Sequence, residues 1–364
     1  MKALLVVGTR PQLIKLASLV KVFDRDNIEY EIVHTGQHYD YEMDYAFFEE
    51  LDLPEPVANL KIGSGLHGWQ TGMMLMKVEE VYQQLKPVLV IVPGDTNSAL
   101  AGGLAAIKMG IHVAHVEAGL RSGLPFMAEE INRVMLDHLS QLLFAPTDAA
   151  YNNLLHEGIG NQAVHLTGDV MADNLILFES KLDRVTLPVD LDSKSYVYVT
   201  LHRSENVDDS EKLKALVEAL IEIPKQHNLK LVFPVHPRTR KRLEEQDLYN
   251  KLNGAEGIHL LKPVSYLTSL GLVKNSAMVL TDSGGLQKES FILRTVVITL
   301  REVTEWVETV QCGWNILVGV DPFKINEAVR QFINVKPRPV DALKLYGNGR
   351  ASERISKTIV EYLE

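Results

Sequence analysis

The chain has 364 residues, 46% of them hydrophobic and 23% charged, with a formal net charge of -10. Single domains usually hold about 100 to 200 residues, so this length predicts two domains that can each bury a core. The acidic balance argues against nucleic-acid and membrane-surface partners, which need a broad positive field. Cys312 is the only cysteine, which excludes an internal disulfide and a thiolate metal cluster.

Short apolar runs alternate with helical patterns from the first residues onward. The run 3–7 stops at Gly8 and is too short for a signal peptide, and no stretch reaches the roughly 20 apolar residues that span a bilayer, so we expect a cytoplasmic protein. Further strands of the first half are expected at 30–35, 88–92, 112–116, 142–145 and 164–167. Helices are expected to begin near Pro11, Glu42, His67, Asn97, Glu129 and Asp148.

A second series of elements follows residues 180–196, a polar, proline-containing stretch typical of a connection between domains. Its strands are expected at 196–201, 230–234, 257–261, 278–280 and 296–300. Its helices are expected near Ser210, Arg238, Ser265, Gly284, Thr304 and Pro322, with a last helix over 351–363. The pattern predicts an α/β fold of two Rossmann-like domains, 1–170 and 171–349, followed by a C-terminal helix in 350–364. We expect the active site in a cleft between these domains, because open parallel sheets bind ligands at the carboxyl ends of their strands.

The first loop with candidate chemistry follows the first strand, at Gly8–Gln12. Arg10 and Lys15 lie at the start of the next helix, where free amides and the helix dipole favour an anionic group. The alternative is a tight turn with two solvated cations. The loop matches neither a Walker A motif nor GxGxxG.

Three carboxylates are candidates for acid/base work. Asp95 and Glu117 each follow an apolar strand, and Glu129 opens a helix. The structural alternatives are that Asp95 caps the next helix, that Glu117 pairs with Arg121 or Arg133, and that Glu129 only complements a helix dipole.

In the second half, His202-Arg203 and His236 follow consecutive strands, an arrangement that favours phosphate binding over isolated surface histidines. Ser283-Gly284-Gly285 opens a helix after an apolar strand, so the backbone can approach a diphosphate. Glu289, one turn further, could accept both hydroxyls of a ribose. A plain capped helix is the alternative.

We expect neither a metal nor a cofactor. His34, His38 and His67 show no HExxH or paired spacing, and no nicotinamide fingerprint is present.

The motifs, in order, resemble the non-hydrolysing UDP-N-acetylglucosamine 2-epimerase family over nearly the whole chain. They are GTRPQ (8–12), HTGQHYDYEM (34–43), GDTNS (94–98), HVEAGLRS (115–122), EEINR (129–133), TLHRSEN (200–206), HPRT (236–239) and LTDSGGLQKES (280–290). The resemblance implies a glycosyltransferase B type architecture, a last helix that returns to the N-terminal domain, a UDP-sugar substrate and a homodimer.

Combining the residue patterns with this resemblance, we predict four catalytic residues: Asp95, Glu117, Glu129 and His202. The predicted substrate-binding residues are Arg10, Lys15, Arg121, Arg133, Arg203, His236, Ser283, Gly284, Gly285 and Glu289. The implied reaction is anti elimination of UDP to a 2-acetamidoglucal, followed by re-addition of UDP with inversion at C2. Cleavage before deprotonation is chemically reasonable, because the C2 proton has no adjacent carbonyl and carboxylates stabilise oxocarbenium character.

The sequence leaves several alternatives open. Gln12, Trp69, Ala128 and Trp306 depart from the commoner family pattern, and part of the motif set is similar to epimerases of UDP-2,3-diacetamido-2,3-dideoxyglucuronate. UDP-N-acetylglucosamine is preferred as the substrate. A glycosyltransferase on the same scaffold, a hydrolysing relative and a binding module without turnover are the other hypotheses.

Overall fold

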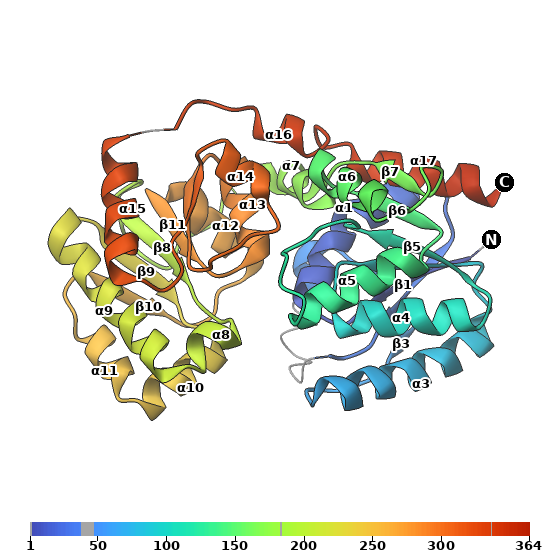
Figure 1. The fold of residues 1–364 in the computed structure, drawn as a ribbon, viewed down its shortest axis with the longest axis horizontal. Coiled ribbons are helices and arrows are strands. Elements are labelled where there is room, and N and C mark those ends of the chain that lie inside the picture. The colour runs from blue at the N-terminus through green and yellow to red at the C-terminus, as the bar shows by residue number, and fades with distance from the viewer. Residues whose placement is uncertain (1, 38–46, 183, 336) are drawn as a thin grey trace. The chain divides into compact units, whose positions relative to one another are not determined.

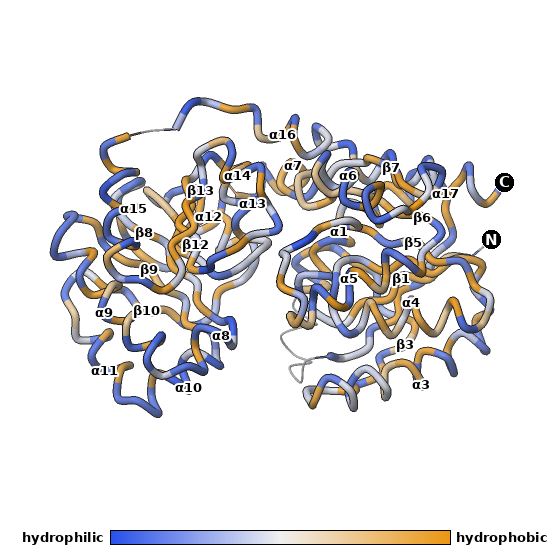
Figure 2. Tube along the Cα trace, in the orientation of Figure 1, coloured by the Kyte–Doolittle hydropathy of each residue, from blue (hydrophilic) through white to orange (hydrophobic). Residues whose placement is uncertain are grey.

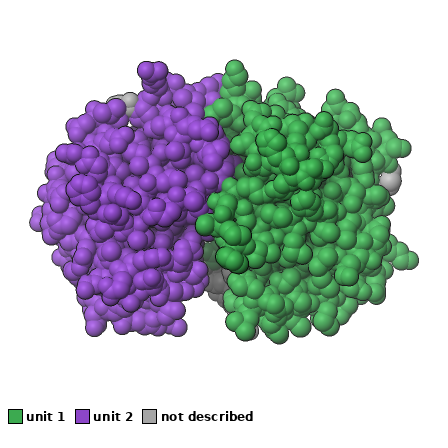
Figure 3. Space-filling view, in the orientation of Figure 1, with its two compact units in different colours: residues 1–177, 343–364 green, residues 178–342 purple. Residues whose placement is uncertain are grey.

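The computed structural model describes residues 2–37, 47–182, 184–335 and 337–364. The chain divides into two compact units, coloured separately in Figure 3. Unit 1 comprises Met1–Leu177 and Leu343–Glu364, and unit 2 comprises Phe178–Ala342. The first division falls inside helix α7 (Val170–Leu182), shown in Figure 1.

Unit 1 is built on a seven-stranded sheet in the order β3-β2-β1-β4-β5-β6-β7, with every pair parallel. Its strands are β1 (Ala3–Val7), β2 (Tyr30–His34), β3 (Ala58–Asn59), β4 (Leu89–Pro93), β5 (His112–Val116), β6 (Leu142–Ala145) and β7 (Val164–Leu166). β1 and β4 are buried at every position. They are continuous apolar runs because helices cover both faces of a parallel sheet.

Besides α7, the helices of unit 1 include α1 (Arg10–Arg25), α3 (His67–Leu85), α4 (Asn97–Lys108), α5 (Ala128–Leu139), α6 (Asp148–His156) and α17 (Ala351–Leu363), and α16 (Ala342–Leu345) starts at the last residue of unit 2. α3, α4 and α5 lie side by side in Figure 1 and share one core with alternate strand residues such as Val6 and Val92. α17 packs along α1.

Unit 2 repeats the pattern with six parallel strands in the order β10-β9-β8-β11-β12-β13. They are β8 (Tyr196–Thr200), β9 (Lys230–Pro234), β10 (Ile258–Leu261), β11 (Met278–Thr281), β12 (Val296–Thr299) and β13 (Asn315–Leu317). The helices are α8 (Ser204–Val207), α9 (Ser210–His227), α10 (Pro237–Glu245), α11 (Leu248–Asn253), α12 (Tyr266–Asn275), α13 (Gly284–Ile292), α14 (Val307–Gln311) and α15 (Pro322–Asn334). The strands at the centre of each unit are hydrophobic in Figure 2.

The α/β prediction of two parallel sheets is confirmed, with corrections at particular elements. α7 was not among the helices expected from the sequence, and the helix expected near Thr304 begins at Val307. The Thr304 hydroxyl accepts from the Trp306 N–H (3.1 Å), which holds this segment in a turn before α14 starts. The helix expected near Glu42 lies outside the described residues.

Candidate active site

In unit 1 the strand order reverses between β1 and β4, and the loops after these two strands are joined by Gln12. The Gln12 side chain accepts from the Gly8 N–H (2.9 Å) and donates to the Pro93 carbonyl (2.9 Å). Such a reversal is where doubly wound sheets bind ligands. Gln12, one of the departures from the family pattern, therefore has a structural function at this edge.

Glu117 closes β5 in a left-handed backbone conformation, with φ of 74°. Its Oε2 forms an ion pair with Lys15 Nζ, and both side chains are largely buried. A Cβ at Gly94 would lie 2.8 Å from Lys15 Nζ, so a side chain there would displace the ammonium from its place in the pair. Residues in strained conformations concentrate at functional sites. The predicted alternative partners of Glu117 have other ion pairs: Arg121 with Glu157, and Arg133 with Asp95.

Asp95 does not cap α4. Thr96 is the N-cap and accepts from the Ala99 N–H (3.2 Å). The Asp95 carboxylate instead forms an ion pair with Arg133, and its carbonyl accepts from Asn132 Nδ2 (2.9 Å). Because its side chain is 28% exposed, Asp95 combines a fixed cation partner with access to solvent.

The two adjacent glutamates of α5 differ in their surroundings. Glu130 is buried and accepts from the N–H groups of Ser122 and Gly123, so it fixes the loop before α5. Among the residues that the structure describes, none hydrogen-bonds the Glu129 carboxylate. The geometry therefore assigns the structural task to Glu130 and leaves Glu129 available for chemistry.

Of the three predicted binding arginines of unit 1, Arg133 pairs with Asp95, and Arg10 and Arg121 are placed differently. Arg10 starts α1 and lies over the Phe47 ring, 5.4 Å from its centroid. Arg121 donates from Nε and Nη2 to Glu157 and from Nη1 to Asp137 (2.7 Å each). Its guanidinium is thus held by two carboxylates of unit 1, and contact with substrate remains a prediction.

In unit 2 the strand order reverses between β8 and β11, and the buried carboxylate of Asp282 joins the loops after them. Asp282 accepts from the backbone N–H groups of His202 (3.0 Å) and Arg203 (2.9 Å), and its Oδ1 lies 3.0 Å from His202 Nδ1. Burial alone would raise the pKa of Asp282, but the charge and hydrogen bond of His202 and these N–H groups bring it below its usual value.

The structure brings the two predicted histidines together. The His202 and His236 rings lie 5.7 Å apart between centroids, and His236 caps α10 by accepting from the Arg238 N–H (3.2 Å). Two imidazoles and Arg203 at one sheet edge provide the donors that an anionic ligand requires.

The Ser283-Gly284-Gly285 segment forms the start of α13. Ser283 is the N-cap and its hydroxyl accepts from the Leu286 N–H, as the plain capped-helix alternative expected, but the amides of Gly284 and Gly285 have no partner inside the helix. A Cβ at Gly285 would meet no described atom within 4 Å. The backbone is thus open to a ligand there. Glu289 is buried and accepts from the Tyr266 hydroxyl (2.8 Å).

Two residues that hold these loops were not singled out from the sequence, Asp282 after β11 and Asn132 in α5. Asp282 lies inside a recognised motif and directly follows a buried strand, as Glu117 does. That position in the sequence could have marked Asp282 as a candidate site residue. Asn132 gave no such signal, because its role depends on a contact with a carbonyl 37 positions away.

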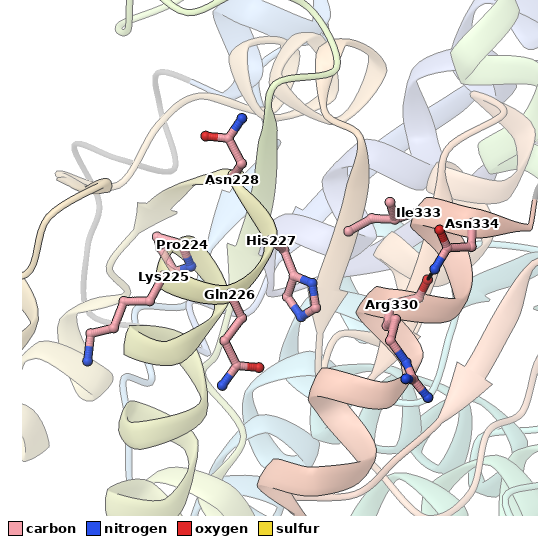
Figure 4. A pocket seen from close by; sticks show the side chains of 8 residues that line it. All are labelled: Pro224, Lys225, Gln226, His227, Asn228, Arg330, Ile333 and Asn334. Atoms are coloured by element: carbon pink, nitrogen blue, oxygen red, sulfur yellow. Dashed lines mark hydrogen bonds between the residues drawn. The ribbon is translucent and has the colours of Figure 1, made fainter.

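Two pockets lie at the opposite, amino edge of the sheets. A pocket of about 490 Å³ in unit 2 lies beside the ends of α9 and α15, just before β9 (Figure 4). It is lined by Pro224, Lys225, Gln226, His227, Asn228, Arg330, Ile333 and Asn334. The other, of about 540 Å³, is lined by residues at the start of β2 in unit 1. Neither contains a predicted site residue.

Metal-ligating clusters and membrane spans are both absent from the part of the chain that the structure describes. No group of three or more histidine, cysteine or acidic side chains there could hold a metal ion. Among the same described residues, no helix has the length and apolar composition needed to cross a membrane.

Two doubly wound parallel sheets, each with cations and a helix N-terminus at the reversal of strand order, are typical of proteins that bind nucleotide-like phosphate ligands. Residues 21–360 match the family described as UDP-N-acetylglucosamine 2-epimerase. The chain belongs to this family, as the motifs predicted, and it is an epimerase.

Individual relatives match this chain over nearly its full length. A UDP-N-acetylglucosamine 2-epimerase homolog of Methanococcus maripaludis is 48% identical, with 99% of each chain covered. The UDP-2,3-diacetamido-2,3-dideoxy-D-glucuronate 2-epimerase of Pseudomonas aeruginosa is 44% identical over 99% of this chain and 100% of that one. The crystal structure of Methanocaldococcus jannaschii UDP-GlcNAc 2-epimerase in complex with UDP-GlcNAc and UDP has a TM-score of 0.91 and 45% identity, over 99% of this chain and 100% of that one.

Proposed function

We propose that the chain converts UDP-N-acetylglucosamine to UDP-N-acetylmannosamine without hydrolysis. The observation that carries the proposal is the register of β4 and β5, in which Pro93 pairs with Val116. Asp95 lies two residues after the end of β4, and Glu117 lies one residue after the end of β5. Asp95 forms an ion pair with Arg133, and Glu117 forms one with Lys15. Two carboxylates delivered to one sheet edge suit proton transfer at a single carbon.

The reaction proceeds in two balanced steps. A carboxylate takes the C2 proton while the C1–O bond breaks, and the bonding electrons leave with the β-phosphate of UDP. The resulting 2-acetamidoglucal then receives a proton at C2 on the other face as the UDP oxygen returns to C1. Asp95 and Glu117 carry out the proton transfers and Glu129 assists.

The departing diphosphate needs donors that are fixed before the reaction starts. We assign this task to Arg10 of unit 1 and, in unit 2, to His202, Arg203 and the Gly284-Gly285 amides. His236, Ser283 and Glu289 complete the binding set, with Glu289 on the ribose. Lys15, Arg121 and Arg133 of unit 1 are the remaining residues that we assign to substrate binding.

A homodimer is proposed from the resemblance alone, and light scattering of the purified protein would test it.

The relative from Pseudomonas aeruginosa supports one second candidate, the 2-epimerisation of UDP-2,3-diacetamido-2,3-dideoxyglucuronate. Incubation of the protein with each UDP-sugar in D2O, followed by NMR, separates the two. We expect inversion at C2 with one deuterium incorporated there, and faster turnover of UDP-N-acetylglucosamine. Release of free sugar, or inversion without deuterium, would contradict the proposed reaction.

A further inference from the structure

A buried polar cluster lies behind the two carboxylates assigned to proton transfer. His115 of β5 and Asp137 of α5 are both fully buried, with His115 Nδ1 at 2.7 Å from Asp137 Oδ1. The other ring nitrogen, Nε2, lies 2.9 Å from the Gly94 carbonyl oxygen. A carboxylate and a carbonyl are both acceptors, so both ring nitrogens must carry a proton to satisfy them. The contacts therefore define an imidazolium.

The charges around the ring fit this protonation state. Asp137 Oδ2 accepts from Arg121 (2.7 Å), and Arg121 also pairs with Glu157. With His115 protonated, two positive groups face two negative groups, and buried charges require such compensation. Burial would raise the pKa of Asp137, but His115 and Arg121 lower it below its usual value, so Asp137 is a carboxylate.

The same cluster reaches the two loops that carry the acid/base residues. Through His115, Asp137 fixes the carbonyl of Gly94, which directly precedes Asp95. Asp137 also contacts the second loop without an intermediate residue, because its Oδ2 accepts from the N–H of Gly119 (3.1 Å), two residues after Glu117. Both glycines have positive φ, 71° and 83°, which glycine adopts readily, whereas the φ of 74° at Glu117 is one that a non-glycine residue rarely adopts and that its surroundings must hold.

We propose that His115, as an imidazolium, and Asp137 are positioning residues that set the spacing between Asp95 and Glu117. This inference rests on the proposed function, in which those two carboxylates move the C2 proton. Neither His115 nor Asp137 touches the substrate. Their contribution is to kcat, because a misplacement of about 1 Å in reacting groups can cost about 100-fold in rate.

The test compares His115→Gln and Asp137→Asn with a matched control, Tyr82→Phe. Tyr82 also donates from a buried side chain to a backbone carbonyl of unit 1, that of Gly102 (3.0 Å), but it fixes neither loop. We expect both variants to lose about 100-fold in kcat, and KM to change by less than about threefold in His115→Gln, which leaves the contact between Asp137 and Arg121 in place. Tyr82→Phe should lose thermal stability and keep its kcat. Folded His115 and Asp137 variants with wild-type kcat, or with a raised KM alone, would overturn the proposal.

A second measurement does not require the variants to fold. In wild-type protein with 15N-labelled histidine, NMR at neutral pH should show one buried ring with both N–H protons protected from exchange and close in space to Gly94. A His115 ring with one bare nitrogen would overturn the proposal. Because this signal does not depend on turnover, it is separate from the proposed function, which would fail if the wild type did not invert C2 of either UDP-sugar.

Discussion

At the scale of single residues, each carboxylate assigned to proton transfer is oriented by a cation from another element. Lys15 of α1 holds Glu117, and Arg133 of α5 holds Asp95. The pairs join residues 102 and 38 positions apart. Sequence spacing indicated that the four residues belong near strand or helix ends, but it could not indicate which cation meets which carboxylate, because that depends on strand order.

Replacing either carboxylate by its amide should stop proton transfer and leave ligand binding intact. We expect Asp95→Asn and Glu117→Gln to lose about 10²- to 10⁴-fold in turnover, the usual contribution of a general acid or base. UDP affinity, measured by calorimetry, should stay close to wild type. Asp24→Asn is the control, because Asp24 accepts from the Tyr30 hydroxyl at the amino edge of the sheet. Near-normal turnover in either amide variant would refute the assignment.

Gly285 allows a prediction in which stability and binding change in opposite directions. It lies in the first turn of α13, where a Cβ would point into open space. Alanine is favoured over glycine in helices by up to about 1 kcal/mol, so Gly285→Ala should match or exceed wild type in urea unfolding. The added methyl group should weaken UDP binding about tenfold, which calorimetry would detect.

Gly72→Ala in α3 is the matched control, since Gly72 is also helical with no described atom within 4 Å of a Cβ. It should stabilise the protein and leave UDP affinity unchanged. Unchanged UDP affinity in Gly285→Ala would remove Gly285 from the binding set.

At the scale of elements, the strands were predictable because buried parallel strands are short, continuous apolar runs bounded by turn residues. α7 was missed for the opposite reason. Its first six residues, 170–175, are all buried, and the two polar ones among them, Asp173 and Asn174, mark no exposed face, so the sequence shows no polar stripe with a helical period. The two-residue β3 is too short to carry any pattern. Helix starts were predicted best where a capping residue marks them, as Thr147 does for α6.

α17 depends on a cap supplied by another helix. Asp173 of α7 accepts from the N–H groups of Ala351 (3.1 Å) and Ser352 (2.7 Å), the first residues of α17. Burial raises the pKa of this carboxyl, although the two N–H groups oppose the shift. Asp173→Ala should lower the free energy of unfolding by about 1 to 2 kcal/mol, the usual loss for a cap, and speed amide exchange in α17.

Asp321→Ala serves as the comparison for this helix. Asp321 caps α15 by accepting from the N–H groups of Phe323 and Lys324. Its loss should reduce stability without changing exchange in α17. If α17 amides exchange at the wild-type rate in Asp173→Ala, the cap does not hold the helix.

At the scale of the whole molecule, one topology occurs twice, and polar residues gather at the strand-order reversal in each unit. In the proposed mechanism, the carboxylates for proton transfer come from unit 1, and the amides and imidazoles for diphosphate binding come from unit 2, together with Arg10 of unit 1. The net charge of -10 is compatible with an anionic ligand because the binding cations are local. The motifs predicted this division, whereas the clusters around Asp137 and Asp282 became visible only in three dimensions.

Cleavage of the C1–O bond is the step on which the proposed chemistry depends. This cleavage can be followed by phosphorus NMR when the wild-type protein is incubated with UDP-N-acetylglucosamine that carries 18O in the bridge between C1 and the β-phosphorus. We predict that the label moves from the bridge to the non-bridging oxygens of the β-phosphate while C2 inverts, because the freed phosphate can rotate before it returns. Inversion at C2 with the label retained in the bridge would contradict elimination and re-addition.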